Sequence, residues 1–184
     1  MVTNSSDAFT GLEAAIVLIA FVVVAAVFSY VVLGAGFFTT QKAQETIYKS
    51  VEQSTTNLLL IGNVYGLSTD NATISEIRFS IGLAPGAPPI DLTKLKVVFS
   101  TPTTAPVILT QGATSSETVF TAKEGGAGSS LDSMVQNQQI EIAFNVTPVP
   151  ANTVINLEIR PAVGAALPFT KTTGATITVT NVLS

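Results

Sequence analysis

Hydrophobic and polar positions divide the chain into two patterns that meet near residue 65. Residues 14–41 carry no formal charge, and residues 14–38 are almost entirely Ala, Val, Ile, Leu, Phe and Gly. About 20 apolar residues in a row are enough for a helix to span a bilayer. A helix that is apolar on every face is unusual inside a small soluble protein, so this segment predicts a membrane-competent helix.

Residues 39–66 change from apolar on every side to apolar on one side. Their apolar positions recur at helical spacing: Ala43, Ile47, Val51 and Leu58. The first firm stop signals are Gly62 and Gly66, and no proline precedes Pro85. We therefore expect one continuous helix over residues 10–61, which would be about 78 Å long at about 1.5 Å per residue.

After residue 67, alternation with a period of two replaces the helical period and predicts strands. The clearest alternations occupy residues 75–83, 139–146 and 153–160, and weaker strands fit residues 94–100, 106–110, 118–122 and 175–181. Short strands between turn residues are typical of an antiparallel β-sandwich. The expected fold class is therefore α+β, with one long N-terminal hydrophobic α-helix followed by an immunoglobulin-like (Ig-like) antiparallel β-sandwich over residues 67–184.

Composition narrows the function classes. Charged residues make up 11% of the chain and its net charge is −4. No basic stripe is present to replace the counterions of a phosphate backbone, so we expect no nucleic-acid partner. The chain has no Cys and no His, which excludes disulfide scaffolds, zinc sites built on those residues and Ser-His-Asp triads. The acids after residue 67 occur singly, as on a solvated surface, so we predict no enzyme, no metal site and no cofactor.

Small and aromatic residues within the apolar segment are candidates for helix packing. Small residues in apolar helices let neighbouring helices approach closely, which favours this role for Gly34 and Gly36 over a nucleotide-binding loop. The candidate packing positions are Phe21, Phe28, Gly34, Gly36, Phe37 and Phe38.

Two glycosylation sequons lie in the predicted β part. They are Asn71-Ala72-Thr73, in a polar loop, and Asn145-Val146-Thr147, whose asparagine falls on the polar face of its strand. Both positions are predicted to be exposed, which favours an extracytoplasmic β domain and a glycoprotein.

The residues around the start of the apolar segment carry a resemblance to a known family. Phe9-Thr10-Gly11-Leu12-Glu13, followed at once by an apolar helix, resembles the processed start of type IV pilin-like subunits. Residues 9–45 resemble more closely the N-terminal helix of archaeal flagellins (archaellins), especially those of methanogens. The resemblance implies an extracellular structural subunit that polymerises into the archaeal flagellum (archaellum) filament used for swimming. Helices would form the core of that helical polymer, and β domains its outer surface.

The resemblance also implies a sequence of processing and assembly steps. Residues 1–8 would be a leader that a membrane peptidase removes between Ala8 and Phe9. Residues 9–62 would span the membrane before assembly and join the filament core afterwards, with an assembly platform as a further partner. Residues 1–8 contain no Lys or Arg, in which they depart from the family's usual leaders.

Glu13 is the one acid at the start of the apolar segment. Its carboxylate and the new amino group at Phe9 would each be costly in an apolar core without a partner. In related pilins the equivalent acid is thought to set register by pairing with an amine, so Phe9, Gly11 and Glu13 are candidate assembly residues. The other interpretation is that Glu13 lies near the helix N-terminus because the helix dipole favours negative charge there.

Two alternative functions remain. An adhesive type IV pilin would share the pilin-like start, but residues 9–45 favour the flagellin. A monomeric membrane-anchored binding module would recognise a ligand with its β-sandwich, and would leave the helix beyond residue 38 and the Phe9–Glu13 group without a role.

Overall fold

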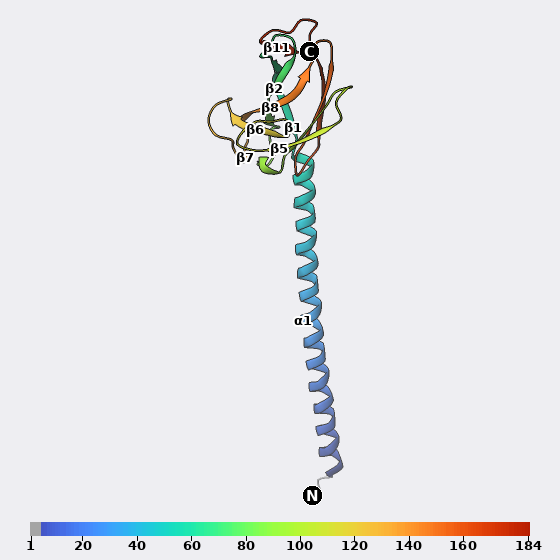
Figure 1. The fold of residues 1–184 in the computed structure, drawn as a ribbon. Coiled ribbons are helices and arrows are strands. Elements are labelled where there is room, and N and C mark those ends of the chain that lie inside the picture. The colour runs from blue at the N-terminus through green and yellow to red at the C-terminus, as the bar shows by residue number, and fades with distance from the viewer. Residues whose placement is uncertain (1–4) are drawn as a thin grey trace. The chain divides into compact units, whose positions relative to one another are not determined.

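The chain forms one long helix and a domain of β-strands, which confirms the α+β class (Figure 1). The computed structural model describes the backbone of Ser5–Ser184 and the side chains from Thr10 onward. Two compact units meet in sequence between Lys49 and Ser50. The first is made by α1 (Ser5–Thr55), and the second contains the end of that helix and every strand.

The expected end of the helix at Ile61, and its extension to residue 62, is wrong. The α1 helix ends at Thr55, and Leu58–Leu67 is strand β1. The Thr55 hydroxyl donates to the carbonyl of Val51 at 2.9 Å, and that of Thr56 donates to Glu52 at 2.7 Å. Such side-chain bonds offer the backbone an alternative partner at a helix end.

Just beyond that helix end, strand pairing replaces the hydrogen bonds of the helix. Leu58 to Ile61 of β1 pair in antiparallel register with the end of strand β2 (Ile74–Leu83). Gly62, expected as a helix stop, has a φ of 73° inside a β-bulge between Ile61 and Tyr65. Glycine, which has no Cβ, adopts this left-handed conformation more readily than other residues do.

The remaining elements follow in chain order: β3 (Ile90–Asp91), the short 3-10 helix η1 (Leu92–Lys94), β4 (Lys96–Ser100), β5 (Val107–Gln111), β6 (Val119–Glu124), β7 (Ser133–Met134), β8 (Gln139–Val149), β9 (Val154–Arg160), β10 (Leu167–Thr172) and β11 (Thr180–Leu183). The three clearest predicted strands are confirmed as β2, β8 and β9. The weaker ones at 94–100, 106–110 and 118–122 are confirmed as β4, β5 and β6. The strand expected at 175–181 begins later, at Thr180, and β1, β3, β7 and β10 were not anticipated.

Nine strands form a mostly antiparallel sheet in the order β10-β9-β4-β5-β6-β8-β2-β1-β11, and β3 pairs with β7 separately. The pair β5–β6 is parallel. Beyond the ladder itself, Thr172 at the end of β10 and Ser184 after β11 exchange backbone hydrogen bonds of 2.7 and 3.3 Å. The two edge strands are therefore bonded to each other at one point, which shortens the unpaired edge that an open sheet presents.

The core lies between the two halves of this sheet, β10-β9-β4-β5 and β6-β8-β2-β1-β11. Phe79 of β2 packs edge-on against Phe169 of β10, with ring centroids 5.5 Å apart. Phe99 of β4 meets Phe144 of β8 at 6.1 Å. The apolar faces predicted for the three clearest strands supply much of this core: Ile77, Phe79, Ile81, Ile140, Ile142, Phe144, Ile155, Leu157 and Ile159 are all buried. The large antiparallel sheet domain is confirmed, and its immunoglobulin-like character stays a prediction.

Candidate assembly surface

The apolar stretch of α1 is solvent-exposed in the single chain. Among the described residues, α1 is the one helix that is long and apolar enough to cross a membrane, and none of its most apolar stretch is buried. A contiguous exposed apolar surface of this size marks a site of contact with a membrane or with other protein chains. The sequence-based expectation of a membrane-competent helix therefore has its physical basis in the exposure of α1.

The aromatic residues proposed for helix packing lie on this exposed surface. Phe21 is 73% exposed and Phe28 71% exposed, and Phe37 and Phe38 are exposed as well. A Cβ added at Gly34 or Gly36 would meet nothing within 4 Å beyond the helix's own backbone. These glycines leave room for another helix to approach, and their role in packing stays a prediction.

Hydroxyl groups at the end of the apolar stretch are satisfied by the helix itself. The Thr39 hydroxyl donates to the carbonyl of Ala35 at 2.8 Å, and Thr40 donates to Gly36 at 2.9 Å. A hydroxyl that has a partner loses less free energy when it moves from water to an apolar environment. Both threonines are thus compatible with contact to lipid or to another helix.

Ion pairs mark the point at which α1 becomes polar. The Glu45 carboxylate accepts hydrogen bonds from Lys42 at 2.8 Å and from Lys49 at 2.7 Å, one turn away on either side. Helical spacing of three or four residues is what brings these groups together. The ion pairs begin where the uncharged segment ends, so the helix changes character within its own length.

The candidate register residues lie at the start of α1. Glu13 is exposed and has no ion-pair partner among the described residues, and a Cβ at Gly11 would meet open space. The side chains of Ala8 and Phe9 lie outside the described residues, so the expected leader cleavage and the pairing at Phe9 stay predictions. A carboxylate in this position needs a partner if it is to enter an apolar environment.

The sequon at Asn71 lies in the loop between β1 and β2. Asn71 is exposed with a φ of 55°. The neighbouring Asp70 carboxylate accepts hydrogen bonds from the backbone of Ala72 and Thr73 at 2.9 Å and from the Thr73 hydroxyl at 2.8 Å. These bonds, led by that of the Thr73 N–H, hold the pKa of Asp70 well below its ordinary value. The loop is therefore well defined, and its modification stays a prediction.

The sequon at Asn145 lies in the middle of the sheet. Asn145 is exposed on β8, opposite Glu76 of β2, as the alternation predicted. Exposure of both asparagines is consistent with carbohydrate attachment, which stays a prediction.

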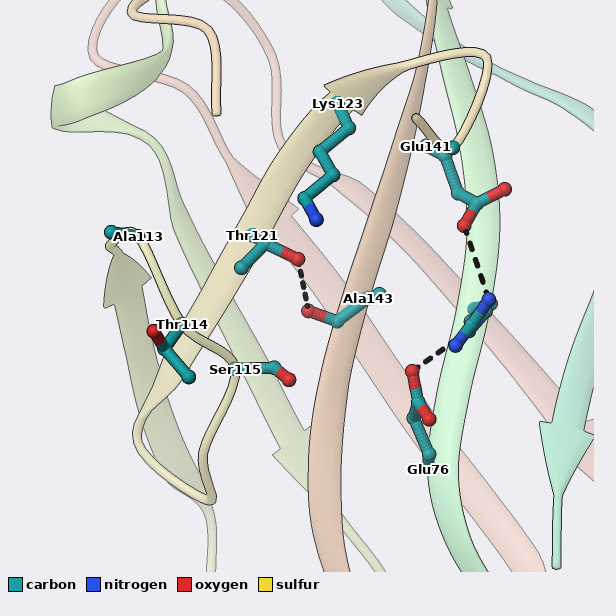
Figure 2. A pocket seen from close by; sticks show the side chains of 10 residues that line it. Glu76, Ala113, Thr114, Ser115, Thr121, Lys123, Glu141 and Ala143 are labelled. Carbon is teal, nitrogen blue, oxygen red and sulfur yellow. Dashed lines mark hydrogen bonds and ion pairs between the residues drawn. The ribbon is translucent and has the colours of Figure 1, made fainter. Parts of the chain in front are cut away.

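Sequence reasoning did not find the charged pocket on the outer side of β2, β6 and β8 (Figure 2). The Arg78 guanidinium lies 2.7 Å from Glu76 and 3.8 Å from Glu141, and the pocket has a volume of about 340 Å³. The hydrogen bond that Arg78 donates to the Glu76 carboxylate raises the pKa of Arg78 above its ordinary value. Glu76 and Arg78 are neighbours on one face of β2, but Glu141 is distant in sequence, so only the pairing of β2 with β8 could have indicated that it joins them.

The chemistry of this pocket is that of an ion-paired surface. Lys123 points into it beside Thr121, whose hydroxyl donates to the Ala143 carbonyl at 3.3 Å. No group of three or more His, Cys, Asp or Glu suited to a metal ion occurs among the described residues. The only acids in the pocket, Glu76 and Glu141, are both engaged by Arg78 rather than positioned as an acid–base pair.

Comparison with known proteins places these features in a family. The family model for archaeal-type flagellin matches residues 8–171. The chain is similar to "Probable flagellin 1" of Archaeoglobus fulgidus, with 40% identity over 181 residues that cover 90% of this chain and 89% of that protein. It is also similar to the "24 kDa flagellin" of Methanospirillum hungatei, with 91% identity over 32 residues, 17% of this chain and all of that sequence.

A solved structure extends the similarity to three dimensions. The archaeal flagellum of Methanospirillum hungatei strain JF1 matches with a TM-score of 0.75 and 34% identity, covering 95% of this chain and 99% of that one. The match includes the helix as well as the β domain, since neither alone makes up so large a share of the chain.

Proposed function

This chain belongs to the archaeal-type flagellin family and is a structural subunit of the archaeal flagellum filament, and from this premise we propose how its two units divide the work. Polymerisation of many copies buries α1 in the filament core, and the β domain forms the outer surface. The observation that carries this division is that the apolar surface of α1 is exposed in the single chain, whereas the β domain has a closed core.

Before assembly, α1 is held in the membrane. A helix that is apolar on every side is solvated by lipid tails as well as by other apolar helices. One surface therefore serves two environments in turn, and transfer between them exposes no large apolar area to water. A platform in the membrane would move each subunit from lipid to the growing filament.

Removal of residues 1–8 between Ala8 and Phe9 by a membrane peptidase creates the new amino group that the assembly step uses. That amino group, from a neighbouring subunit or from the same one, neutralises the Glu13 carboxylate and fixes the axial register of the helices. The exposed position of Glu13 and its lack of an ion-pair partner among the described residues support this role.

Peptide mass spectrometry of filaments sheared from cells tests the processing step. We expect an N-terminal peptide that begins at Phe9. A peptide that still begins at Met1 in assembled filaments would contradict removal of the leader and would return the role of Glu13 to the helix dipole.

The Glu13→Gln variant tests the register step, because it keeps the size of the side chain and removes the charge. We expect few or no filaments by electron microscopy and an unchanged melting temperature of the β domain. The matched control is Glu52→Gln, an acid of the same helix beyond the apolar stretch, which should assemble normally. Filaments of normal number and length from Glu13→Gln would overturn the proposed register.

Electron microscopy and deletion of the gene separate the filament subunit from the two alternative functions. Sheared cells that yield no filaments would favour a monomeric membrane-anchored module. Deletion of the gene that abolishes attachment but leaves swimming intact would favour an adhesive pilin.

A further inference from the structure

The outward faces of β1 and β11 carry apolar side chains where a solvated sheet carries polar ones. Leu59 is 47% exposed, Ile61 38%, Tyr65 39% and Val182 55%. Antiparallel strands with one face on the core and one in water alternate apolar and polar residues. These four residues break that alternation, and we call them the β1–β11 strip.

The strip includes residues of both strands, with Leu59 and Ile61 before the β-bulge of β1 and Tyr65 after it. Tyr65 and Val182 are directly paired, so their side chains lie side by side on one face. The Ile61 side chain extends over β2, because a Cβ added at Gly82 would lie 2.5 Å from its Cδ1 atom. Glycine at this position lets Ile61 lie flat on the neighbouring strand and widens the apolar surface.

The outward face of the other half of the sheet provides a contrast within the same domain. On β9, Arg160 forms an ion pair of 2.7 Å with Glu158. Asn156 accepts a hydrogen bond of 3.0 Å from Thr170 of β10. Ile108 of β5 is 53% exposed, and its cross-strand partner Val98 of β4 is half-buried and pairs in turn with Glu158. Polar side chains thus predominate on the outward face of β9, whereas apolar side chains form the strip on β1 and β11.

We propose that a second copy of this chain covers the β1–β11 strip in the filament. The inference rests on the proposed function, because it requires subunits that pack into a polymer. The strip begins at Leu59, just after α1 ends at Thr55, so it continues along the chain from the surface that enters the core. An exposed apolar patch of this kind marks an interaction site.

The geometry of a helical polymer determines the kind of contact. Contacts that repeat along a filament are heterologous, meaning that one patch meets a different surface of the next copy. The β1–β11 strip therefore contacts a surface of its neighbour other than the neighbour's own strip. Replacement of the strip's side chains by smaller ones should weaken the polymer without changing the fold of the subunit.

The absence of cysteine from the chain allows a direct test. Val182→Cys introduces a single thiol on the strip, and Ile108→Cys introduces one at a position of nearly equal exposure, 53% against 55%. Each variant is labelled with a maleimide in sheared filaments and again in subunits dissociated with detergent. We expect the Val182→Cys thiol to react about tenfold or more slowly in filaments, because thiol reactivity depends on access, and the Ile108→Cys thiol to react at similar rates in both.

Three results would overturn the inference: rapid labelling of Val182→Cys in filaments, equal protection of both positions, or protection of Val182→Cys in membranes that is lost in filaments. The last would assign the strip to a lipid surface.

Failure of Val182→Cys to assemble, with normal assembly of Ile108→Cys, would support the inference that a second copy covers the strip. Electron microscopy of the parent chain keeps the two proposals separate, because filaments with a freely labelled strip refute this inference alone, whereas a parent chain without filaments refutes the proposed function.

Discussion

Phenylalanine residues in the two units of the molecule have opposite surroundings. In α1, Phe21 is 73% exposed and Phe28 71% exposed, whereas in the β domain Phe79 is 1% exposed and Phe144 is fully buried. The β domain encloses these two phenylalanines between two halves of one sheet and needs no other molecule to do so. The helix has no second layer within its own unit.

This difference assigns the source of stability in each unit. Burial of apolar side chains inside the chain stabilises the β domain, so substitutions there act on folding. The same side chains in α1 gain their burial only from lipid or from other copies, so substitutions there act on insertion and assembly. The predictions below test this separation.

The largest effect is expected for Phe144→Ala. This side chain is fully buried and packs edge-on against Phe79 and Phe99, so its removal leaves a cavity that should destabilise the β domain by about 3–5 kcal/mol. Chemical denaturation of the full chain in detergent, followed by circular dichroism, measures the change. Phe28→Ala in α1 is the control and should leave the unfolding of the β domain unchanged. Equal shifts for the two variants would refute the separation.

A charge in the middle of the apolar stretch of α1 should impair membrane insertion and assembly and leave the folding of the β domain unchanged. Val24→Lys places an ammonium group where lipid or another helix is expected, at a cost of about 2.5–3.5 kcal/mol for insertion. We expect loss of the chain from the membrane fraction and loss of filaments, with no change in the melting of the β domain. Ile108→Lys, at an exposed position of β5, should remain in the membrane fraction. Retention of Val24→Lys in membranes would argue against the proposed span.

A smaller effect is expected where the chain leaves the helix. Gly164, with a φ of 102°, lies against Thr56, and a Cβ there would collide with the Thr56 carbonyl oxygen. Gly164→Ala should destabilise the β domain by about 2–3 kcal/mol, because strained backbone and a steric conflict add. Gly86→Ala has a similar φ of 86° but open space around it, so it should cost only about 1–2 kcal/mol. Thermal unfolding compares the two variants, and equal losses would mean that the contact with Thr56 is unimportant.

The smallest effect is electrostatic and depends on pH. The hydroxyl of Thr93, and then the ammonium of Lys94, lower the pKa of Asp91 from 3.8 to about 2. A carboxylate with a lowered pKa in the folded state contributes stability that is present above its unfolded pKa, near 3.8, and is lost as the pH falls towards 2. Asp91→Asn should therefore lower the melting temperature slightly at pH 7 and not at pH 2. Asp132→Asn is the control, and a deficit of Asp91→Asn that persists unchanged at pH 2 would contradict the prediction.

Much of the fold could be predicted from local sequence patterns, because those patterns show which residues of one segment share a face. Alternation in residues 139–146 placed Ile140, Ile142 and Phe144 on the buried face, and β8 confirms it. The same local logic failed for residues 58–61, whose apolar side chains fit a helix as well as a strand. Pairing with β2 decides between them, and that pairing joins positions distant in sequence.

The candidate assembly surface on α1 likewise has features that the sequence establishes and roles that depend on partners. The uncharged, wholly apolar character of residues 14–41 follows from side-chain chemistry alone, so the sequence by itself determined that this segment requires lipid or other helices around it. The sequence also identified Phe9, Gly11 and Glu13 as candidate assembly residues. The partners proposed for these residues follow from the proposed function, and those roles remain predictions.

The tertiary structure alone decided how distant strands share one surface. The parallel β5–β6 pair, the ion pair of Arg78 with Glu141, and the β1–β11 strip all depend on which strands are neighbours. Periodicity states which residues share a face of one strand, but it carries no information on which strand lies next to it. Those neighbours follow from closing a single core, a property of the whole domain rather than of any segment.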